Sequence, residues 1–277
     1  MPVTGSKSYR PLCLSIRIYA GGFSFFVCDQ QSNTLVCGEH FQLKENELLS
    51  DRLLLELGRP DYSNRQIDLC YVLVCGPTTH VPLEEFRRDE AVALYDFVLG
   101  RGGDAADRRV AYTILPQLET AELFMLPRDV EDVVLQYYPT ARFFASRSML
   151  MERLLHVEEN ADDACRRLYL CAETDGYSLL AFDNMRLLFA NTFEVSTVAD
   201  ALYFVLNVFQ TLGMDAEADH LVFVAPSAER DRQLQTQVAD YILHVDSLMP
   251  ADLFPHVRLA AEPQVPVDLA ALLLNRL

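Results

Sequence analysis

The chain carries one pattern of strands and turns twice, and this internal repeat constrains its fold more than any other feature. Residues 14–41 read LSIRIYAGGFSFFVCDQQSNTLVCGEHF, and residues 168–193 read LYLCAETDGYSLLAFDNMRLLFANTF. Each copy predicts a strand, a turn with glycine, a second strand ending in Asp, another turn, and a third strand ending in Phe. The aligned residues are Gly22 with Gly176, Phe23 with Tyr177, Ser24 with Ser178, Asp29 with Asp183, Leu35 with Leu187, and Phe41 with Phe193.

Helices and an apolar strand are expected behind each copy. After the first copy, leucines at helical spacing predict a helix over Glu45–Leu57, a covered strand follows at Ile67–Cys75, and a second helix is expected at about 83–99. The elements expected after the second copy are a helix at Thr197–Leu212, a strand at His220–Ala225, a helix at Ala228–Val245, and a final helix or strand at Val267–Leu277. Two such β-β-β-α-β-α units predict an α/β protein of two domains, with mixed sheets flanked by helices.

The acidic stretch Glu158–Asp163 is the best boundary between the halves, because charge density rises there and apolar periodicity ends. We therefore expect a first domain over 11–160 and a second over 165–277, the latter with a C-terminal extension. The first domain contains an extra segment at about 109–148 that has no counterpart in the second copy. Ser148 is expected to cap the last helix of the first domain.

Composition restricts the environment and the partners. No apolar run approaches the roughly 20 residues that a membrane-spanning helix needs, and the seven cysteines lack the spacing of a disulfide framework or a zinc site. We expect a soluble, cytoplasmic protein without a metal site. The formal net charge of −17 disfavours binding to nucleic acid and to anionic membranes. An unknown protein partner stays open, as does the choice between monomer and homodimer.

The repeat resembles the actin-like ATPase fold shared by actin, sugar kinases and the Hsp70 nucleotide-binding domain. More closely, the chain is similar to an uncharacterised bacterial family of unknown function that has a divergent form of this fold. The stretches that carry this closer resemblance are LSIRIYAGGFSFFVCD, VPLEEF at Val81–Phe86, YPTARFFASRS at Tyr138–Ser148, and Ala190–Asp215. The resemblance implies a cleft between the halves in which active relatives bind nucleotide.

The loops that would hold a nucleotide lack the expected chemistry. The resemblance implies an acidic residue two positions before a glycine in the first turn of each half, and a glycine pair in the adenosine loop. Here Ala20 replaces the first acid, Asp175 is adjacent to its glycine, and the adenosine loop 225–228 reads APSA. The residues that would border the cleft are nevertheless candidate cofactor-binding residues, namely Gly21, Gly22, Ser24, Asp175, Gly176, Ser178 and Ser227.

Our leading hypothesis is a degenerate, non-hydrolysing actin-like protein that serves as a binding or scaffold module. We expect no catalytic residue and no cofactor, although weak binding of ATP and Mg²⁺ without turnover stays open. The alternative is a divergent ATPase or sugar-kinase-like phosphotransferase. That alternative predicts an open, polar cleft lined by Ser24, Asp175, Ser178 and Ser227.

Overall fold

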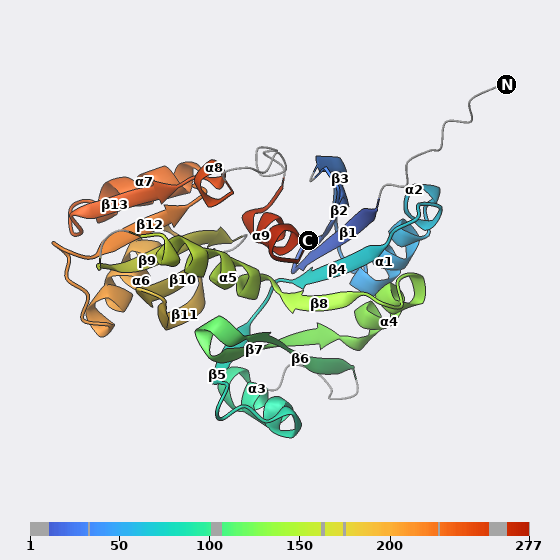
Figure 1. The fold of residues 1–277 in the computed structure, drawn as a ribbon, viewed down its shortest axis with the longest axis horizontal. Helices are drawn as coiled ribbons and strands as arrows, with labels where there is room; N and C mark the ends of the chain where they lie inside the picture. The colour runs from blue at the N-terminus through green and yellow to red at the C-terminus, as the bar shows by residue number, and fades with distance from the viewer. Residues whose placement is uncertain are drawn as a thin grey trace.

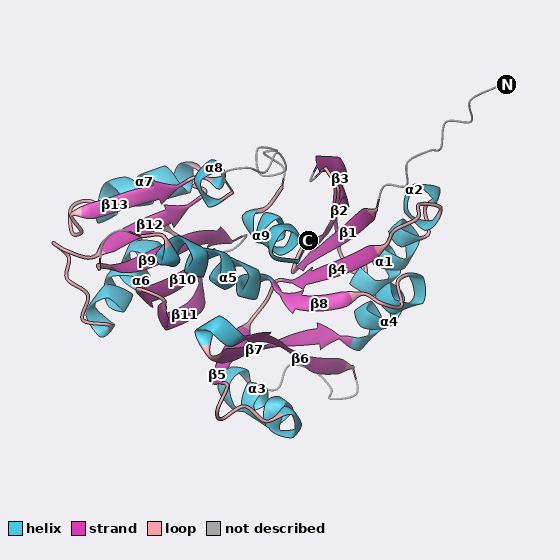
Figure 2. Cartoon of the chain, viewed as in Figure 1, coloured by secondary structure: helices cyan, strands magenta, loops and turns pink. Residues whose placement is uncertain are grey.

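Two five-stranded mixed sheets with the same strand order dominate the computed structural model (Figures 1 and 2). The structure describes residues 11–32, 34–100, 107–161, 164–173, 176–226, 228–254 and 265–276. The first sheet has the order β3-β2-β1-β4-β8, and the second has the order β11-β10-β9-β12-β13. In each sheet the first three strands are antiparallel neighbours, and the last two run parallel to the central strand. The α/β architecture with two similar halves is therefore confirmed.

The strands of the two sheets have matching lengths and places. The first sheet consists of β1 (Leu12–Tyr19), β2 (Gly22–Asp29), β3 (Thr34–Gln42), β4 (Leu69–Val74) and β8 (Arg142–Ala145). The second sheet consists of β9 (Arg166–Glu173), β10 (Gly176–Asp183), β11 (Arg186–Glu194), β12 (His220–Val224) and β13 (His244–Leu248).

The strand register confirms the alignment of the repeat residue by residue. Phe23 pairs with Phe41 in the first sheet, and Tyr177 pairs with Phe193 in the second. Both third strands also have a register shift at the same aligned place, opposite Val27/Cys28 in one half and opposite Ala181/Phe182 in the other. A β-bulge strengthens the local twist of a strand pair, so both hairpins bend in the same way.

The aligned glycines of the repeat, Gly22 and Gly176, are required for the same steric reason. A Cβ atom on Gly22 would lie 2.0 Å from the carbonyl oxygen of Phe41, and one on Gly176 would lie 1.9 Å from that of Phe193. Neither contact can be relieved by rotating a side chain, because the obstacle is backbone. Glycine at the start of each second strand is therefore required by the close approach of the third strand.

Five layers result, because helices cover the outer face of each sheet and two more lie between the sheets. The outer helices of the first sheet are α1 (Leu49–Leu57), α2 (Pro60–Ser63) and α4 (Arg128–Tyr137), and those of the second are α6 (Val198–Thr211) and α7 (Glu229–Val238). The central helices are α5 (Ser146–Glu159) and α9 (Val267–Arg276), which share one apolar core with residues of both sheets. The four-residue helix α8 (Pro250–Leu253) joins that core.

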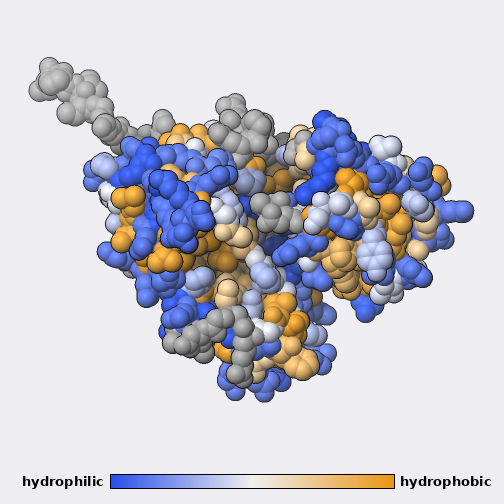
Figure 3. Space-filling model, turned by 180° about the vertical axis from the view of Figure 1, so that it is seen from behind, coloured by the Kyte–Doolittle hydropathy of each residue, from blue (hydrophilic) through white to orange (hydrophobic). Residues whose placement is uncertain are grey.

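An insertion after β4 forms a separate small sheet with the order β5-β7-β6 at the bottom of Figure 1. Its elements are β5 (Thr78–Pro82), the 3-10 helix η1 (Arg88–Glu90), α3 (Ala91–Leu99), β6 (Arg108–Leu115), the 3-10 helix η2 (Pro116–Leu118) and β7 (Thr120–Pro127). Helix α3 exposes Val92, Phe97 and Val98. In the view from behind, hydrophobic residues accordingly reach the lower end of the molecule (Figure 3).

Several predicted elements differ from the observed ones. The helix expected at about 83–99 is shorter, because a turn and the 3-10 helix η1 occupy residues 83–90 and α3 begins only at Ala91. The helix expected at Ala228–Val245 ends at Val238, and the edge strand β13 follows it. Helix α5 begins two residues before Ser148 with Ala145 as its N-cap, so Ser148 does not cap it. Ser148 is instead fully buried inside the helix and donates a hydrogen bond to Glu122.

The unmatched part of the first half also lies elsewhere than expected. Helix α4 and strand β8 occupy the places that α7 and β13 hold in the second half. The segment without a counterpart is therefore residues 78–127, where the sequence had indicated about 109–148. The acidic stretch at 158–163 begins inside α5, which extends to Glu159, and Glu158 is buried and accepts a hydrogen bond from Tyr169. Among the described helices, none combines the length and the apolar character needed to cross a bilayer.

Candidate functional site: a polar network between the halves

The first part of the site is a buried ion pair between strand β1 and helix α9. Arg17 Nε donates to Asp268 Oδ2 at 2.7 Å, and Arg17 Nη2 lies 3.9 Å from Glu173 Oε2. The Ser146 hydroxyl also donates to Asp268. Asp268 lies in the first turn of α9, where the helix dipole favours a negative charge. This pair therefore connects the first sheet to the central helices and to the end of β9.

The charges in this part of the site perturb one another. Burial lowers the pKa of Arg17, but Asp268, with smaller contributions from Cys75 and Glu173, raises it above its ordinary value. Burial raises the pKa of Glu173, and the nearby Asp268 carboxylate raises it further. A second anion brought to this place would therefore meet two carboxylates that already repel each other.

The second part of the site is a buried ion pair between helix α5 and the insertion. Arg147 Nε donates to Glu122 Oε1 at 3.0 Å, and Arg147 Nη1 donates to Thr192 Oγ1 on β11 at 3.3 Å. Thr78 donates to Glu122 at 2.6 Å, and Ser148 also donates to it. Burial is the largest single influence and raises the pKa of Glu122, but Arg147 acts together with His80 and the hydrogen bonds from Ser148 and Thr78 to hold the pKa below its ordinary value. Glu122 is therefore a buried carboxylate that is held ionised by its partners.

Hydroxyl groups join the two ion pairs into one network. Ser178 Oγ donates to Glu173 Oε1 and lies within hydrogen-bond distance of Thr192 Oγ1, both at 2.8 Å. Thr192 in turn accepts from Arg147. The network therefore runs without a break from the insertion through α5, β11 and β10 to β9, β1 and α9.

His80 on β5 lies beside this network and is expected to make stability depend on pH. Its Nε2 is 3.5 Å from Glu122 Oε1. The pKa of His80 is lowered to about 4, mainly by burial and in part by Arg147, although Glu122 acts in the opposite direction. The ring is therefore neutral in the folded protein, whereas an unfolded histidine binds a proton below a pH of about 6.5. The contribution of His80 to stability is complete above that pH and is lost as the pH falls towards 4.

Lowering the pH from 7.5 to 5 should lower the free energy of unfolding by about 2 kcal/mol, because His80 then binds a proton in the unfolded but not in the folded protein. The variant His80→Gln should lose about 2 kcal/mol less stability than the wild-type protein over the same pH range, as measured by urea unfolding at both pH values. The matched control is His156→Gln, at a side chain that is 41% exposed, and it should keep the slope of the wild-type protein. Equal slopes for wild type and His80→Gln would contradict the assignment.

A cavity of about 270 Å³ remains between the halves beside the network. Ser146, Arg147, Glu173 and Cys75 contribute to its lining. Burial raises the pKa of the Cys75 thiol to about 12, so this cysteine is a neutral wall of the cavity. The volume is below the roughly 300–1,000 Å³ that is usual for small-molecule pockets.

The structure brings together only some of the cleft residues predicted from the sequence. Gly176 and Ser178 line the cavity, whereas Gly21, Gly22 and Ser24 do not belong to its lining. Ser24 is buried and lies 2.7 Å from His40 Nδ1. Asp175 and Ser227 lie outside the described residues. Ligand binding by these residues stays a prediction.

The sequence reasoning did not find the charged members of the network, which are Arg17, Glu122, Arg147, Glu173 and Asp268. A usable signal existed for two of them, because Arg17 and Glu122 interrupt otherwise apolar strands, and charges buried in strands need partners. No signal in the sequence pairs Arg17 with Asp268, since 251 positions separate them. Among the described residues, no three histidine, cysteine or acidic side chains gather in a way that could hold a metal ion.

Comparison with known families decides the membership of the chain. Residues 6–245 match the model of a family described as "Protein of unknown function (DUF3822)". The chain belongs to this family. No curated protein matches the chain.

Solved structures identify the fold of this family member. It is similar to a protein from Bacteroides thetaiotaomicron with an actin-like ATPase fold and unknown function, with a TM-score of 0.80, 21% identity and 96% coverage of each chain. It is also similar to a chain of the PilM-PilN type IV pilus biogenesis complex, with a TM-score of 0.56, 12% identity, and coverage of 96% of this chain and 98% of that chain. The predicted actin-like fold is therefore confirmed.

Proposed function

We propose that this protein is a non-hydrolysing member of the actin-like fold that serves as a binding or scaffold module. The observation that supports the proposal is the network between the halves, in which Arg17 and Arg147 are already paired with carboxylates. The resemblance implies that active members of the fold bind their nucleotide in the cleft between the halves. Here the two arginines are outnumbered by three carboxylates, those of Glu122, Glu173 and Asp268.

These residues do not suit a nucleoside triphosphate. A triphosphate would have to displace Asp268 or Glu173 from Arg17 and would leave a buried carboxylate without its cation, which is costly. Its own charge would also be repelled by the remaining carboxylates at short range. The cavity of about 270 Å³ adds little room for such a ligand.

A binding role also agrees with the similarity to the PilM-PilN structure, which is a complex in type IV pilus biogenesis. The chain is similar to that structure over almost its full length. An actin-like fold can thus serve to hold a partner. We infer the same class of role for this protein, while the identity of its partner is a separate question.

Isothermal titration with Mg-ATP tests the proposal. We expect no saturable heat up to about 1 mM nucleotide, which corresponds to binding weaker than about 4 kcal/mol, and no release of phosphate. An actin-like ATPase measured under the same conditions serves as the positive control. Micromolar affinity together with turnover would overturn the proposal in favour of an ATPase or phosphotransferase.

A further inference from the structure

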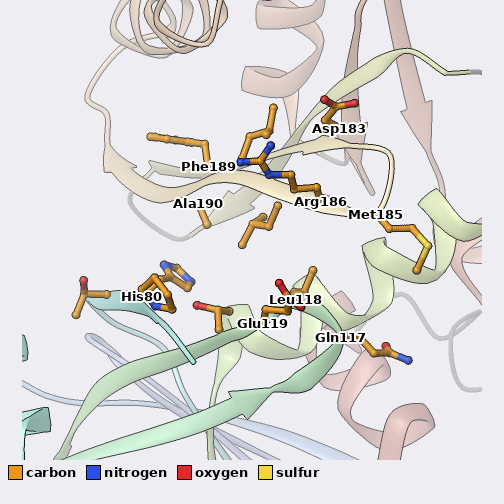
Figure 4. A pocket seen from close by; sticks show the side chains of 14 residues that line it. His80, Gln117, Leu118, Glu119, Asp183, Met185, Arg186, Phe189 and Ala190 are labelled. Carbon is orange, nitrogen blue, oxygen red and sulfur yellow. The ribbon is translucent and has the colours of Figure 1, made fainter. Parts of the chain in front are cut away.

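A second, larger hollow lies between the insertion and the second half. It has a volume of about 810 Å³ and is bordered by β5, η2 and the start of β7 on one side and by β11 on the other. Figure 4 shows Arg186, Phe189 and Ala190 on one wall, with His80, Leu118 and Glu119 on the facing wall. We refer to this hollow as the β11 groove.

Both walls of the β11 groove contain an edge strand. Strand β11 is the outer strand of the second sheet and pairs with β10, and β5 is the outer strand of the insertion sheet and pairs with β7. Among the described residues, neither strand has a partner strand on its other side. An edge strand presents a row of unpaired backbone N–H and C=O groups, which is a template for one further strand.

Arg147 closes one end of the space between these two edges. It donates to Thr192 Oγ1 on β11 and to the hydroxyl of Thr78 on β5. Away from this bridge the walls separate, and the groove opens along residues 186–190 of β11. Five residues of an extended strand span about 17 Å. The insertion lies opposite the β11 edge. The space between them therefore suits a single extended segment better than the edge strand of a folded domain.

The lining of the β11 groove indicates the chemistry of such a segment. Leu118, Leu187 and Phe189 supply apolar surface, and Phe189 is held in place because it stacks on Phe193, with ring centroids 6.3 Å apart. The charged groups of the lining are the carboxylates of Glu119 and Asp183 and the guanidinium of Arg186. Carboxylates outnumber the cation, and the whole chain carries −17.

We propose that the β11 groove binds an extended, basic segment of a partner protein, which adds to β11 as an additional strand. Apolar side chains of the segment would contact Leu118 and Phe189, and lysine or arginine side chains on its other face would contact Glu119 and Asp183. Strand addition of this kind derives affinity from backbone hydrogen bonds and specificity from alternate side chains. The proposal rests on the proposed binding function and gives it a site and a class of partner.

Two pools of fluorescein-labelled nonapeptides test the proposal by fluorescence anisotropy. In one pool Val, Ile, Leu or Phe alternates with Lys, Arg or Thr, and in the other the same apolar positions alternate with Asp, Glu or Thr. The basic pool should bind at least about tenfold more tightly than the acidic pool, a difference of about 1.4 kcal/mol. A single basic peptide from the better pool is then N-methylated at successive positions. Methylation at one set of alternate residues should abolish binding, and methylation at the other set should not.

Matched variants locate the peptide on the protein. Glu119→Lys should weaken the affinity for the basic peptide about fivefold or more. Glu217→Lys is an equal change of charge at an exposed residue of the second half, and it should change the affinity less than about twofold. Hydrogen exchange should slow in β11 on addition of peptide and stay unchanged in β3, the equivalent edge strand of the first half. Thermal unfolding of each variant confirms that it is folded.

Each remaining outcome counts against the β11 groove. Equal binding of both pools, equal effects of the two lysine variants, or protection of β3 would overturn the assignment. Without peptide, β11 could become protected as the protein concentration rises, together with a dimer in sedimentation. That result would mean that a second copy of the chain, and not a partner protein, occupies the groove. Failure of the peptide experiments without Mg-ATP binding would refute this inference alone, whereas Mg-ATP turnover would refute the proposed function.

Discussion

Replacing Glu122 by Gln is expected to lower the free energy of unfolding by about 3–5 kcal/mol, because it leaves a buried arginine without its carboxylate. Glu122 is fully buried, and Arg147 is 5% exposed. Glutamine keeps the volume of the side chain and can still bond to Thr78, so the lost charge is the main change. Urea unfolding at pH 7.5, followed by circular dichroism, measures the effect.

Two further variants show whether the Arg147–Glu122 pair is the cause. Glu119→Gln, at an exposed carboxylate three positions earlier, should change stability by less than about 0.5 kcal/mol. The double variant Glu122→Met with Arg147→Met removes both charges and should recover most of the loss, because apolar replacements of a buried pair are often neutral. A loss below about 1 kcal/mol in Glu122→Gln would mean that Arg147 is stabilised mainly by Thr78 and Thr192.

Replacing Gly176 by Ala is expected to destabilise the second half by about 3 kcal/mol or more, since its Cβ would lie 1.9 Å from the carbonyl oxygen of Phe193. The backbone of β11 would have to move away from β10, which disturbs the pairing of the whole hairpin. Gly22→Ala should act similarly in the first half, where the distance to the Phe41 oxygen is 2.0 Å. Thermal unfolding compares the two variants with the wild-type protein.

Gly21→Ala is the matched control for both glycine variants. The nearest atom to its added Cβ is a ring carbon of Tyr19 at 3.9 Å, which is an ordinary contact. This variant should therefore stay within about 1 kcal/mol of the wild-type protein. If Gly176→Ala were equally mild, the close approach of the third strand would not be what requires glycine there.

The fold could be predicted because its information is local and is present twice. The strand pattern, the glycine of each hairpin and the Asp that ends each second strand recur at matching places, and the register of the two sheets reproduces that alignment. The capping box that Thr197 and Asp200 form at the start of α6 is equally local, because it depends only on their own spacing. Such features depend on neighbours within a few residues.

The differences arose where tertiary contacts outweigh local preference. Strand β13 lies in a stretch that reads as the end of a helix, but its pairing with β12 determines its conformation. Strand β5 was not predicted from the sequence, and its pairing with β7 likewise determines its conformation. The site was the least predictable part, since Arg17 and Asp268 are neighbours only after both halves have folded. A sequence can reveal that Glu122 interrupts an apolar strand, but it does not reveal that Arg147 is the cation that pairs with it.

The place of α9 between the sheets has a consequence for biosynthesis. Its residues from Leu269 to Leu273 complete the apolar core that the inner faces of both sheets share. The first sheet ends with β8 at Ala145, so during translation its inner face lacks the cover of α9 while more than one hundred further residues are synthesised. Contacts so distant along the chain form slowly, and exposed apolar surface in the meantime favours aggregation. The nascent protein is thus expected to depend on chaperones until residue 273 has left the ribosome.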